Sequence, residues 1–356
     1  MKILVVAPNW IGDAVMAQPM LRLLRRRWPN ARITALAPAH VAPVLDAMPE
    51  VTRTIPTWFG HGGVQLFERV GLARKLRREA FDRAYVLPNS AKSALIPWLA
   101  GIPVRVGYAG EWRVGLLNRR LPNPARNAAR PPMVERYAAL AVDDPQRIDR
   151  LDTRHADRPR LTVDPASVAI TKAKFLGGAK RTIGFCPGAE FGPAKRWPPA
   201  HFAQLADRIA ERYPDTRIVC LGGPGDAPIA DAIVTASTAD IANLCGHTQL
   251  KEAIALMKSL SAVVTNDTGL MHVAAALDVP VVALYGSTDP HHTPPHSPLA
   301  RIEKIDIACS PCFQRECPLG HFRCMNDLSP DQVMNSLALV LAPAIAGSGG
   351  AHHTSA

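Results

Sequence analysis

The chain alternates short apolar runs with amphipathic stretches, twice over, and this pattern restricts its fold more than any other feature. In the first series the expected strands are Lys2–Ala7, Ile33–Ala37, Val51–Ile55, Ala84–Leu87 and Val104–Val106. In the second series they are Thr182–Cys186, Arg217–Leu221, Ile241–Leu244, Ala262–Thr265 and Val281–Tyr285. Helical patterns such as Val64–Glu79 separate them. Continuous apolar strands that alternate with helices are typical of parallel sheets covered by helices on both faces.

An irregular stretch divides the two series. The segment 121–132 carries four prolines, and the segment 143–160 is charged and poor in apolar residues. A length of 356 residues suits two domains of ordinary size. We therefore expect an α/β protein with two doubly wound, Rossmann-like parallel-sheet domains that face each other across a cleft. The expected bounds are 1–165 and 166–330, with a closing helix at 331–343 and a flexible tail at 344–356.

Composition and charge limit the cellular setting. The chain is 47% hydrophobic, yet no run reaches the roughly 18 apolar residues that a membrane span needs. Its first segment lacks the basic start of a signal peptide, so we expect a cytoplasmic protein. The charge is uneven: residues 1–165 carry 26 Lys and Arg against 14 Asp and Glu, a net +12, whereas residues 166–356 carry 15 against 16.

The basic first half has two interpretations. It could meet a polyanion, either nucleic acid or an anionic membrane surface, or it could hold arginines on solvated faces without a partner. Only 6% of the residues are aromatic, and the basic residues form no recognisable nucleic-acid-reading module. These features argue against nucleic acid.

The turn after the first expected strand, Pro8-Asn9-Trp10-Ile11-Gly12-Asp13, lies where open α/β sheets bind ligands. Its single glycine distinguishes it from a dinucleotide-binding fingerprint, and the Lys-Ser/Thr pair of a P-loop is missing. Asp13 has two interpretations. It could be the N-cap of the following helix, or a carboxylate that acts as a general base in the cleft.

Two Gly-rich turns of the second half suit a phosphate-bearing ligand. The first runs from Cys186 to Pro198, contains Gly188, and carries the cations Lys195 and Arg196 just before a helix. From the sequence, Lys195 could equally be a solvated surface lysine. The second, Gly222-Gly223-Pro224-Gly225-Asp226, allows close approach of a ligand to the backbone, and the carboxylate of Asp226 could bind ribose hydroxyls.

The string Thr265-Asn266-Asp267-Thr268-Gly269-Leu270-Met271-His272 is the most specific of the chain. Asp267 and Thr268 can cap the helix that follows, and the free N–H groups at Thr268, Gly269 and Leu270 form an anion site. His272 falls about one turn further along, on the same side as Thr268. The alternative is a capped helix with an incidental histidine.

Seven cysteines fall into two sets. Three stand singly in apolar stretches and are expected in the core: Cys186, Cys220 and Cys245. The other four crowd into sixteen positions: Cys309, Cys312, Cys317 and Cys324. Four thiolates could bind a structural zinc, but their spacing is not that of the usual knuckle pair. A packing or reduced-thiol role is favoured.

Several strings carry a resemblance to a known family. N-W-I-G-D-A-V, A-K-R-W-P, and N-D-T-G-L-M-H-V-A-A-A followed by L-Y-G-S-T-D-P resemble the ADP-heptose:lipopolysaccharide heptosyltransferases. These are inverting glycosyltransferases of the GT-B fold, and the resemblance covers essentially residues 1–342. The cysteine-rich string C-S-P-C-F-Q-R-E-C-P-L-G-H-F-R-C-M resembles that of heptosyltransferase II rather than heptosyltransferase I.

The resemblance implies transfer of L-glycero-D-manno-heptose from ADP-heptose onto heptosyl-Kdo2–lipid A, in synthesis of the lipopolysaccharide inner core. Asp13 matches the family's base and Lys195 its phosphate-binding lysine. The remaining residues of the implied donor site are Gly188, Asp226, Asp267, Thr268, Gly269 and His272. Because no Asp-x-Asp metal motif stands at a strand end, we expect the leaving diphosphate to be stabilised without a metal or cofactor.

One departure from the family affects the donor site. Heptosyltransferase I has threonines in the loop before the lysine, where this chain has Ala189 and Glu190. Backbone N–H groups are therefore expected to bind more of the phosphate here.

The implied acceptor is anionic, as are the lipids around it. The basic first domain would then serve a protein that is peripheral to the inner face of the inner membrane. The expected acceptor contacts lie in cleft-side loops: Arg53, Arg113, Arg119 and Arg120. The alternatives are heptosyltransferase I, another GT-B sugar-nucleotide enzyme such as an epimerase, and, from a different class, a basic nucleic-acid-binding protein.

Overall fold

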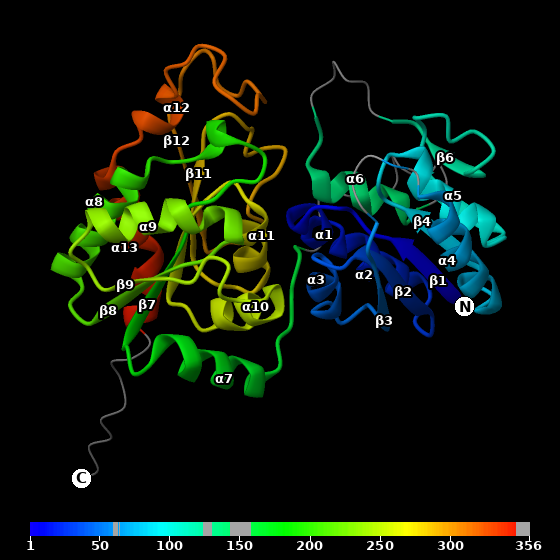
Figure 1. Cartoon of the computed structure of the whole chain (residues 1–356), viewed down its shortest axis with the longest axis horizontal. Helices are drawn as coiled ribbons and strands as arrows, with labels where there is room; N and C mark the ends of the chain where they lie inside the picture. Colours follow the sequence, from blue (N-terminus) through cyan, green and yellow to red (C-terminus); the bar gives the residue numbers. More distant parts are fainter. Residues whose placement is uncertain (60–62, 64, 124–129, 143–157, 347–356) are drawn as a thin grey trace, which may run out of the picture. The chain divides into compact units, whose positions relative to one another are not determined.

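The computed structural model describes residues 1–59, 63, 65–123, 130–142 and 158–346 (Figure 1). The chain divides into two compact units, Met1–Thr162 and Val163–Ala356. Each unit is built on a six-stranded sheet whose strand pairs are all parallel. Most of the predicted irregular segment 143–160, and the predicted tail from residue 347 onward, lie outside the described residues.

The first unit has the strand order β3-β2-β1-β4-β5-β6. Its strands are β1 (Lys2–Val6), β2 (Arg32–Pro38), β3 (Arg53–Thr57), β4 (Arg83–Val86), β5 (Val104–Tyr108) and β6 (Arg119–Leu121). Its helices are α1 (Ile11–Met16), α2 (Gln18–Arg27), α3 (Ala42–Asp46), α4 (Leu66–Arg78), α5 (Ala91–Leu99) and α6 (Met133–Leu140). Helix α1 packs with α3 and α6, and α4 packs with α5.

The second unit repeats this topology with the order β12-β11-β10-β7-β8-β9. Its strands are β7 (Arg181–Cys186), β8 (Thr216–Cys220), β9 (Ile241–Asn243), β10 (Ala262–Asn266), β11 (Val281–Tyr285) and β12 (Ala300–Lys304). Its helices are α7 (Pro165–Leu176), α8 (Pro199–Arg212), α9 (Ala227–Ala236), α10 (Leu250–Lys258), α11 (Gly269–Ala276), α12 (Arg323–Asn326) and α13 (Pro330–Ala346). Helices α8 and α9 pack together, as do α10 and α11, so two helical layers cover the sheet (Figure 1).

The strand order reverses direction between β1 and β4 in the first unit and between β7 and β10 in the second. Ligands of open parallel sheets bind at such switch points, beyond the carboxyl ends of the strands. The polar turns that follow β1, β7 and β10 are three of the four turns singled out from the sequence, and the fourth follows β8. The topology therefore places each predicted turn at the edge of its sheet where a ligand binds.

The sequence pattern missed the two edge strands β6 and β12. Strand β6 has only three residues, and exposed charged residues interrupt the apolar character of both strands, as in the segment Arg119-Arg120-Leu121. The closing helix α13 runs to Ala346 rather than ending at 343. Its buried residues Val333, Leu337 and Leu341 pack onto the sheet and α8, which offsets the cost of a proline near its end. No helix in the described part of the chain is long and apolar enough to cross a membrane.

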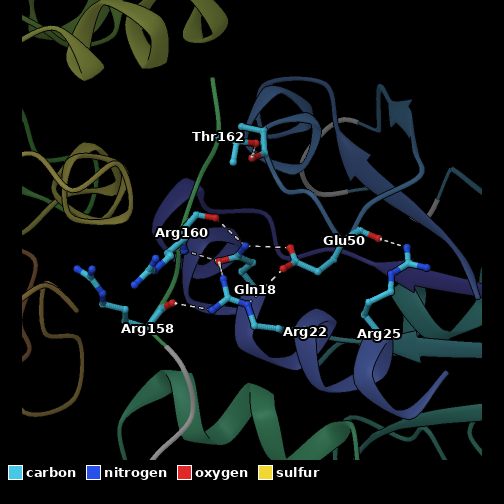
Figure 2. A network of polar contacts seen from close by, with 8 residues as sticks. Gln18, Arg22, Arg25, Glu50, Arg158, Arg160 and Thr162 are labelled. Atoms are coloured by element: carbon cyan, nitrogen blue, oxygen red, sulfur yellow. Dashed lines mark hydrogen bonds and ion pairs between the residues drawn. The ribbon is translucent and has the colours of Figure 1, made fainter. Parts of the chain in front are cut away.

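Buried polar contacts anchor the segment that leaves the first unit (Figure 2). Gln18 of α2 is fully buried, and its Nε2 donates to the carbonyl of Arg160 at 2.6 Å and to the carboxylate of Glu50 at 2.9 Å. The N–H of Thr162 donates to the carbonyl of Ala47 at 2.8 Å. Because a buried amide left without partners is costly, these bonds define the path of the chain at the end of the unit.

Candidate active site

In the second unit, Asn266 joins the turns that form the site. It ends β10 and is fully buried. Its Oδ1 accepts the N–H of Trp197 at 3.1 Å, and its Nδ2 donates to the carbonyl of Pro187 at 2.7 Å. The turn after β7 and the segment before α8 are thereby fixed against the end of β10.

Lys195 and Asp267 form an ion pair within this site. The distance from Lys195 Nζ to Asp267 Oδ2 is 2.6 Å, and the two side chains are 13% and 5% exposed. The hydroxyl of Thr288, which follows β11, donates to the same oxygen at 2.6 Å. The interpretation of Lys195 as a solvated surface lysine is therefore wrong. Its cation is held at the carboxyl edge of the sheet, where a phosphate can reach it.

Thr268 is the N-cap of α11. Its Oγ1 accepts the N–H of Leu270 at 3.2 Å, whereas the carboxylate of Asp267 turns to Lys195 and Thr288 instead. The helix begins at Gly269, and the partial positive charge at its N-terminus adds to that of the lysine.

His272 lies one turn into α11 and is buried. Burial lowers its pKa to about 4; the charge of Asp267 acts in the opposite direction, and His296 and Lys195 add to the lowering. His272 is therefore neutral at physiological pH. It can donate a hydrogen bond to a ligand but supplies no positive charge.

Gly188 and Asp226 bring the turns after β7 and β8 together. A Cβ atom at Gly188 would overlap the carboxylate of Asp226, so the close approach requires glycine. Asp226 accepts the N–H of Gly223 at 3.0 Å. Burial raises the pKa of Asp226, and the nearby Arg196 guanidinium opposes this shift. Five of the seven residues predicted for the donor site thus lie in the turns that follow β7, β8 and β10, and the other two, Gly269 and His272, lie in the helix α11 that follows the last of these turns.

Sequence reasoning left several polar residues out of the site. Asn266 and Thr288 make the contacts above, and Ser287 is buried with no partner for its hydroxyl among the described residues. The Nε of Arg196 is also buried without a partner in that part of the chain. Three of these residues could have been found from the sequence. Arg196 lies in the string A-K-R-W-P, Ser287 and Thr288 lie in L-Y-G-S-T-D-P, and all three follow a strand end.

In the first unit, Asp13 is the third residue of α1, and Trp10 is the N-cap position. The N-cap interpretation of Asp13 is therefore wrong, although the carboxylate still lies in the first turn, where the helix dipole favours its charged form. The phenol of Tyr137, from α6, hydrogen-bonds the Asp13 side chain. Asp13 is thus a half-buried carboxylate at the switch point of the sheet.

A cavity of about 330 Å³ adjoins this turn at the carboxyl ends of β1, β2, β3 and β4. Asn9, His40, Trp58, Arg69 and Lys92 are among the residues that line it, and none of the described lining residues is acidic. Arg69 is buried, with its guanidinium 4.1 Å from the ring centroid of Phe59. The Lys92 ammonium has no partner among the described residues, so the cavity, which Asn9 of the Asp13 turn also lines, offers an available cation.

Two of the four predicted acceptor arginines do not lie where the sequence placed them. Arg53 begins β3 rather than following a strand, so it stands at the amino edge of the sheet, in an ion pair with Glu79 at 2.5 Å. Arg113 is buried and donates to the carbonyls of Pro88, at 2.9 Å, and Tyr108. It holds the loops after β4 and β5 and is not an exposed cation. Arg119 and Arg120 are exposed on the edge strand β6.

The clustered cysteines line a small cavity of about 20 Å³ together with His321. The four are Cys309, Cys312, Cys317 and Cys324, and all are free thiols. The described residues contain no group of three or more His, Cys, Asp or Glu side chains arranged to hold a metal ion. Cys186, Cys220 and Cys245 are buried, as expected of core residues.

Comparison with known proteins gives a consistent result. Residues 69–323 match the model of glycosyltransferase family 9 (heptosyltransferase). The chain is 43% identical to lipopolysaccharide heptosyltransferase 2 of Salmonella typhimurium, over 96% of this chain and 99% of that protein.

Solved structures share the fold. The structure of Escherichia coli ADP-heptose lipopolysaccharide heptosyltransferase II, 40% identical, superposes with a TM-score of 0.83 over 97% of this chain and all of that one. An Escherichia coli heptosyltransferase solved with ADP, 20% identical, has a TM-score of 0.67 over 96% of this chain and all of that one. The two-sheet architecture is thus that of the GT-B type. The chain belongs to glycosyltransferase family 9, the heptosyltransferases.

Proposed function

We propose that this chain is an inverting glycosyltransferase that moves L-glycero-D-manno-heptose from ADP-heptose onto heptosyl-Kdo2–lipid A. The observation that carries the proposal is the largely buried ion pair of Lys195 and Asp267 at the N-terminus of α11, where a diphosphate would bind. The likeness to lipopolysaccharide heptosyltransferase 2 over 96% of the chain supports this acceptor rather than that of heptosyltransferase I.

The second unit would bind the donor. Lys195 and the first N–H groups of α11 face the diphosphate, while neutral His272 donates a hydrogen bond. Asp226, beside the glycine turn after β8, would bind the ribose hydroxyls. Because negative charge grows on the diphosphate as it leaves, groups fixed in advance at this position stabilise the transition state more than the bound donor.

The first unit would supply the base. The acceptor hydroxyl oxygen forms a bond to the anomeric carbon of the heptose while the bond from that carbon to the β-phosphate oxygen breaks. Asp13 takes the hydroxyl proton, and ADP leaves with the electron pair. Attack from the face opposite the leaving group inverts the anomeric configuration.

The acceptor would enter the cavity beside the Asp13 turn. Lys92 and Arg69 suit an anionic sugar, and Trp58, which is 82% exposed, can contact the apolar face of a sugar ring. Arg119 and Arg120 are proposed to attract the same acceptor and the anionic lipids around it. The enzyme would then work on the cytoplasmic side, peripheral to the inner membrane.

The test is an assay with ADP-heptose and heptosyl-Kdo2–lipid A, in which mass spectrometry follows the addition of one heptose. Asp13→Asn should lower kcat by about 10²–10⁴-fold and leave ADP affinity unchanged, because the amide cannot accept the proton. Kdo2–lipid A without its first heptose, offered in parallel, should be a poor acceptor.

Three results would contradict the proposal. Equal use of Kdo2–lipid A would indicate the activity of heptosyltransferase I. An altered sugar nucleotide formed without any lipid would indicate an epimerase. Native turnover by folded Asp13→Asn would remove that carboxylate from the mechanism.

A further inference from the structure

We propose that Thr288 is a positioning residue of the donor site, whose hydroxyl stabilises the Asp267 carboxylate while Lys195 turns toward the diphosphate of the donor. The inference rests on the proposed function, because that function brings a diphosphate to Lys195. The observation behind it is that two donors meet at one oxygen atom. Lys195 Nζ and Thr288 Oγ1 each lie 2.6 Å from Oδ2 of Asp267.

Two contacts hold the Lys195 ammonium at Asp267. Its Nζ lies 2.6 Å from the carboxylate oxygen Oδ2 and 3.4 Å from the backbone carbonyl oxygen of the same residue. An ammonium group has three N–H donors, so these contacts engage most of its capacity for hydrogen bonds. A diphosphate must therefore draw the ammonium away from Asp267 in order to bind it fully.

The Asp267 carboxylate can release the lysine only if it keeps another donor. Its side chain is 5% exposed, so water has little access to replace a lost partner, and a buried charge without a partner is costly. The Thr288 hydroxyl supplies a partner that does not depend on the lysine. When this hydroxyl is removed, Lys195 is the remaining side-chain partner of the carboxylate among the described residues, and the carboxylate should hold it more tightly.

The turn that carries Thr288 is itself fixed by the cysteine-rich segment. The hydroxyl of Ser310 donates to the carbonyl of Gly286 at 2.7 Å, and the N–H of Phe313 donates to the carbonyl of Ser287 at 2.7 Å. Both carbonyls belong to the two residues that precede Thr288. The fold therefore holds the hydroxyl against the carboxylate before any donor binds.

Three variants at position 288 test the hydroxyl. Thr288→Val keeps the shape of the side chain and removes its donor, so the Kd for ADP, measured by calorimetry, should rise by about 10-fold. Thr288→Ala also removes the hydroxyl and should have the same effect. Thr288→Ser keeps the hydroxyl and should stay within about twofold of the native Kd.

The matched control is Thr171→Val, on α7 of the same unit. It removes a hydroxyl that donates to the carbonyl of Ser167 at 2.9 Å, away from the donor site. The Kd for ADP should stay native in this variant.

Two further measurements separate an effect on the lysine from a general disturbance of the turn. Adenosine has no phosphate, so its Kd should not change in Thr288→Val. In the Asp267→Asn background, Thr288→Val should cause little further loss of ADP affinity, because no charged carboxylate remains to hold the lysine.

Native ADP affinity in Thr288→Val would overturn the proposal. An equal loss in Thr288→Ser, an equal loss of adenosine affinity, or an equal loss in the Asp267→Asn background would overturn it in favour of a packing role for the turn. If the native chain binds no ADP, the proposed function fails and this inference fails with it. If the native chain binds ADP but transfers no heptose, the proposed function fails alone, and the ADP measurements still decide the role of Thr288.

Discussion

At the scale of single residues, Lys92 distinguishes a specific acceptor site from a generally basic surface. It lines the cavity beside the Asp13 turn, and its ammonium has no partner among the described residues. Lys92→Ala should raise KM for the lipid acceptor by about 10-fold, the usual worth of one hydrogen bond to a charged group, and leave KM for ADP-heptose unchanged. Steady-state kinetics with each substrate varied in turn measures both values.

The matched control for this prediction is Lys75→Ala. Lys75 is exposed on α4, in the same unit, and does not line the cavity. Both variants remove one positive charge. If the two raise acceptor KM equally, the effect belongs to net charge and the cavity is not the acceptor site.

The sequence predicted which residue types lie at the strand ends, but not which side chains contact one another there. Asp267 was expected to be a possible cap, whereas its carboxylate binds Lys195 and Thr288, which lie 72 and 21 residues away. Arg113 was expected in an open loop, whereas it is buried under carbonyl groups. Such partners depend on how separate strands are brought side by side, and no local pattern encodes that.

At the scale of elements, the interior strands of both sheets were predicted, and so were the edge strands β3 and β9, whereas the edge strands β6 and β12 were not. Strand β11 has the predicted bounds, Val281–Tyr285, because all five residues are buried and apolar. An edge strand such as β6 needs charge to discourage pairing with other chains, and that charge erases the apolar signal. Strand β3 begins at Arg53, two residues later than predicted, and Arg53 therefore lies at the amino edge of the sheet and not in a cleft-side loop.

Helix α13 provides a stability prediction with an internal control. Leu337 is fully buried against the second unit, while Leu339 on the same helix is 53% exposed. Leu337→Ala should lower the free energy of unfolding of that unit by about 2–5 kcal/mol, since it leaves a cavity. Leu339→Ala should change it by no more than about 0.5 kcal/mol. Urea unfolding of both variants measures the difference, and equal losses would mean that α13 does not contribute to the core.

At the scale of the whole molecule, positive charge is concentrated in the unit proposed to bind the acceptor. Residues 1–165 carry a net +12, from 26 basic and 14 acidic residues, and the rest of the chain carries −1. The charges of the donor site are not exposed in this way, because its ion pair of Lys195 and Asp267 is largely buried. Salt screens exposed charges strongly and buried pairs weakly. The two substrates should therefore respond differently to ionic strength.

The last prediction follows from that difference. Between 0.1 M and 1 M salt the screening length falls from about 10 Å to about 3 Å, so attraction of an anionic lipid by exposed arginines should fade. KM for the lipid acceptor should rise steeply over this range, and KM for ADP-heptose should rise less. The double variant Arg119→Ala/Arg120→Ala, on β6, should reduce the rise of acceptor KM with salt concentration. Arg74→Ala/Arg78→Ala, exposed on α4, removes the same charge and should not. If KM rises equally with salt for both substrates, and the β6 variant leaves that rise unchanged, these arginines lie on solvated faces without a partner.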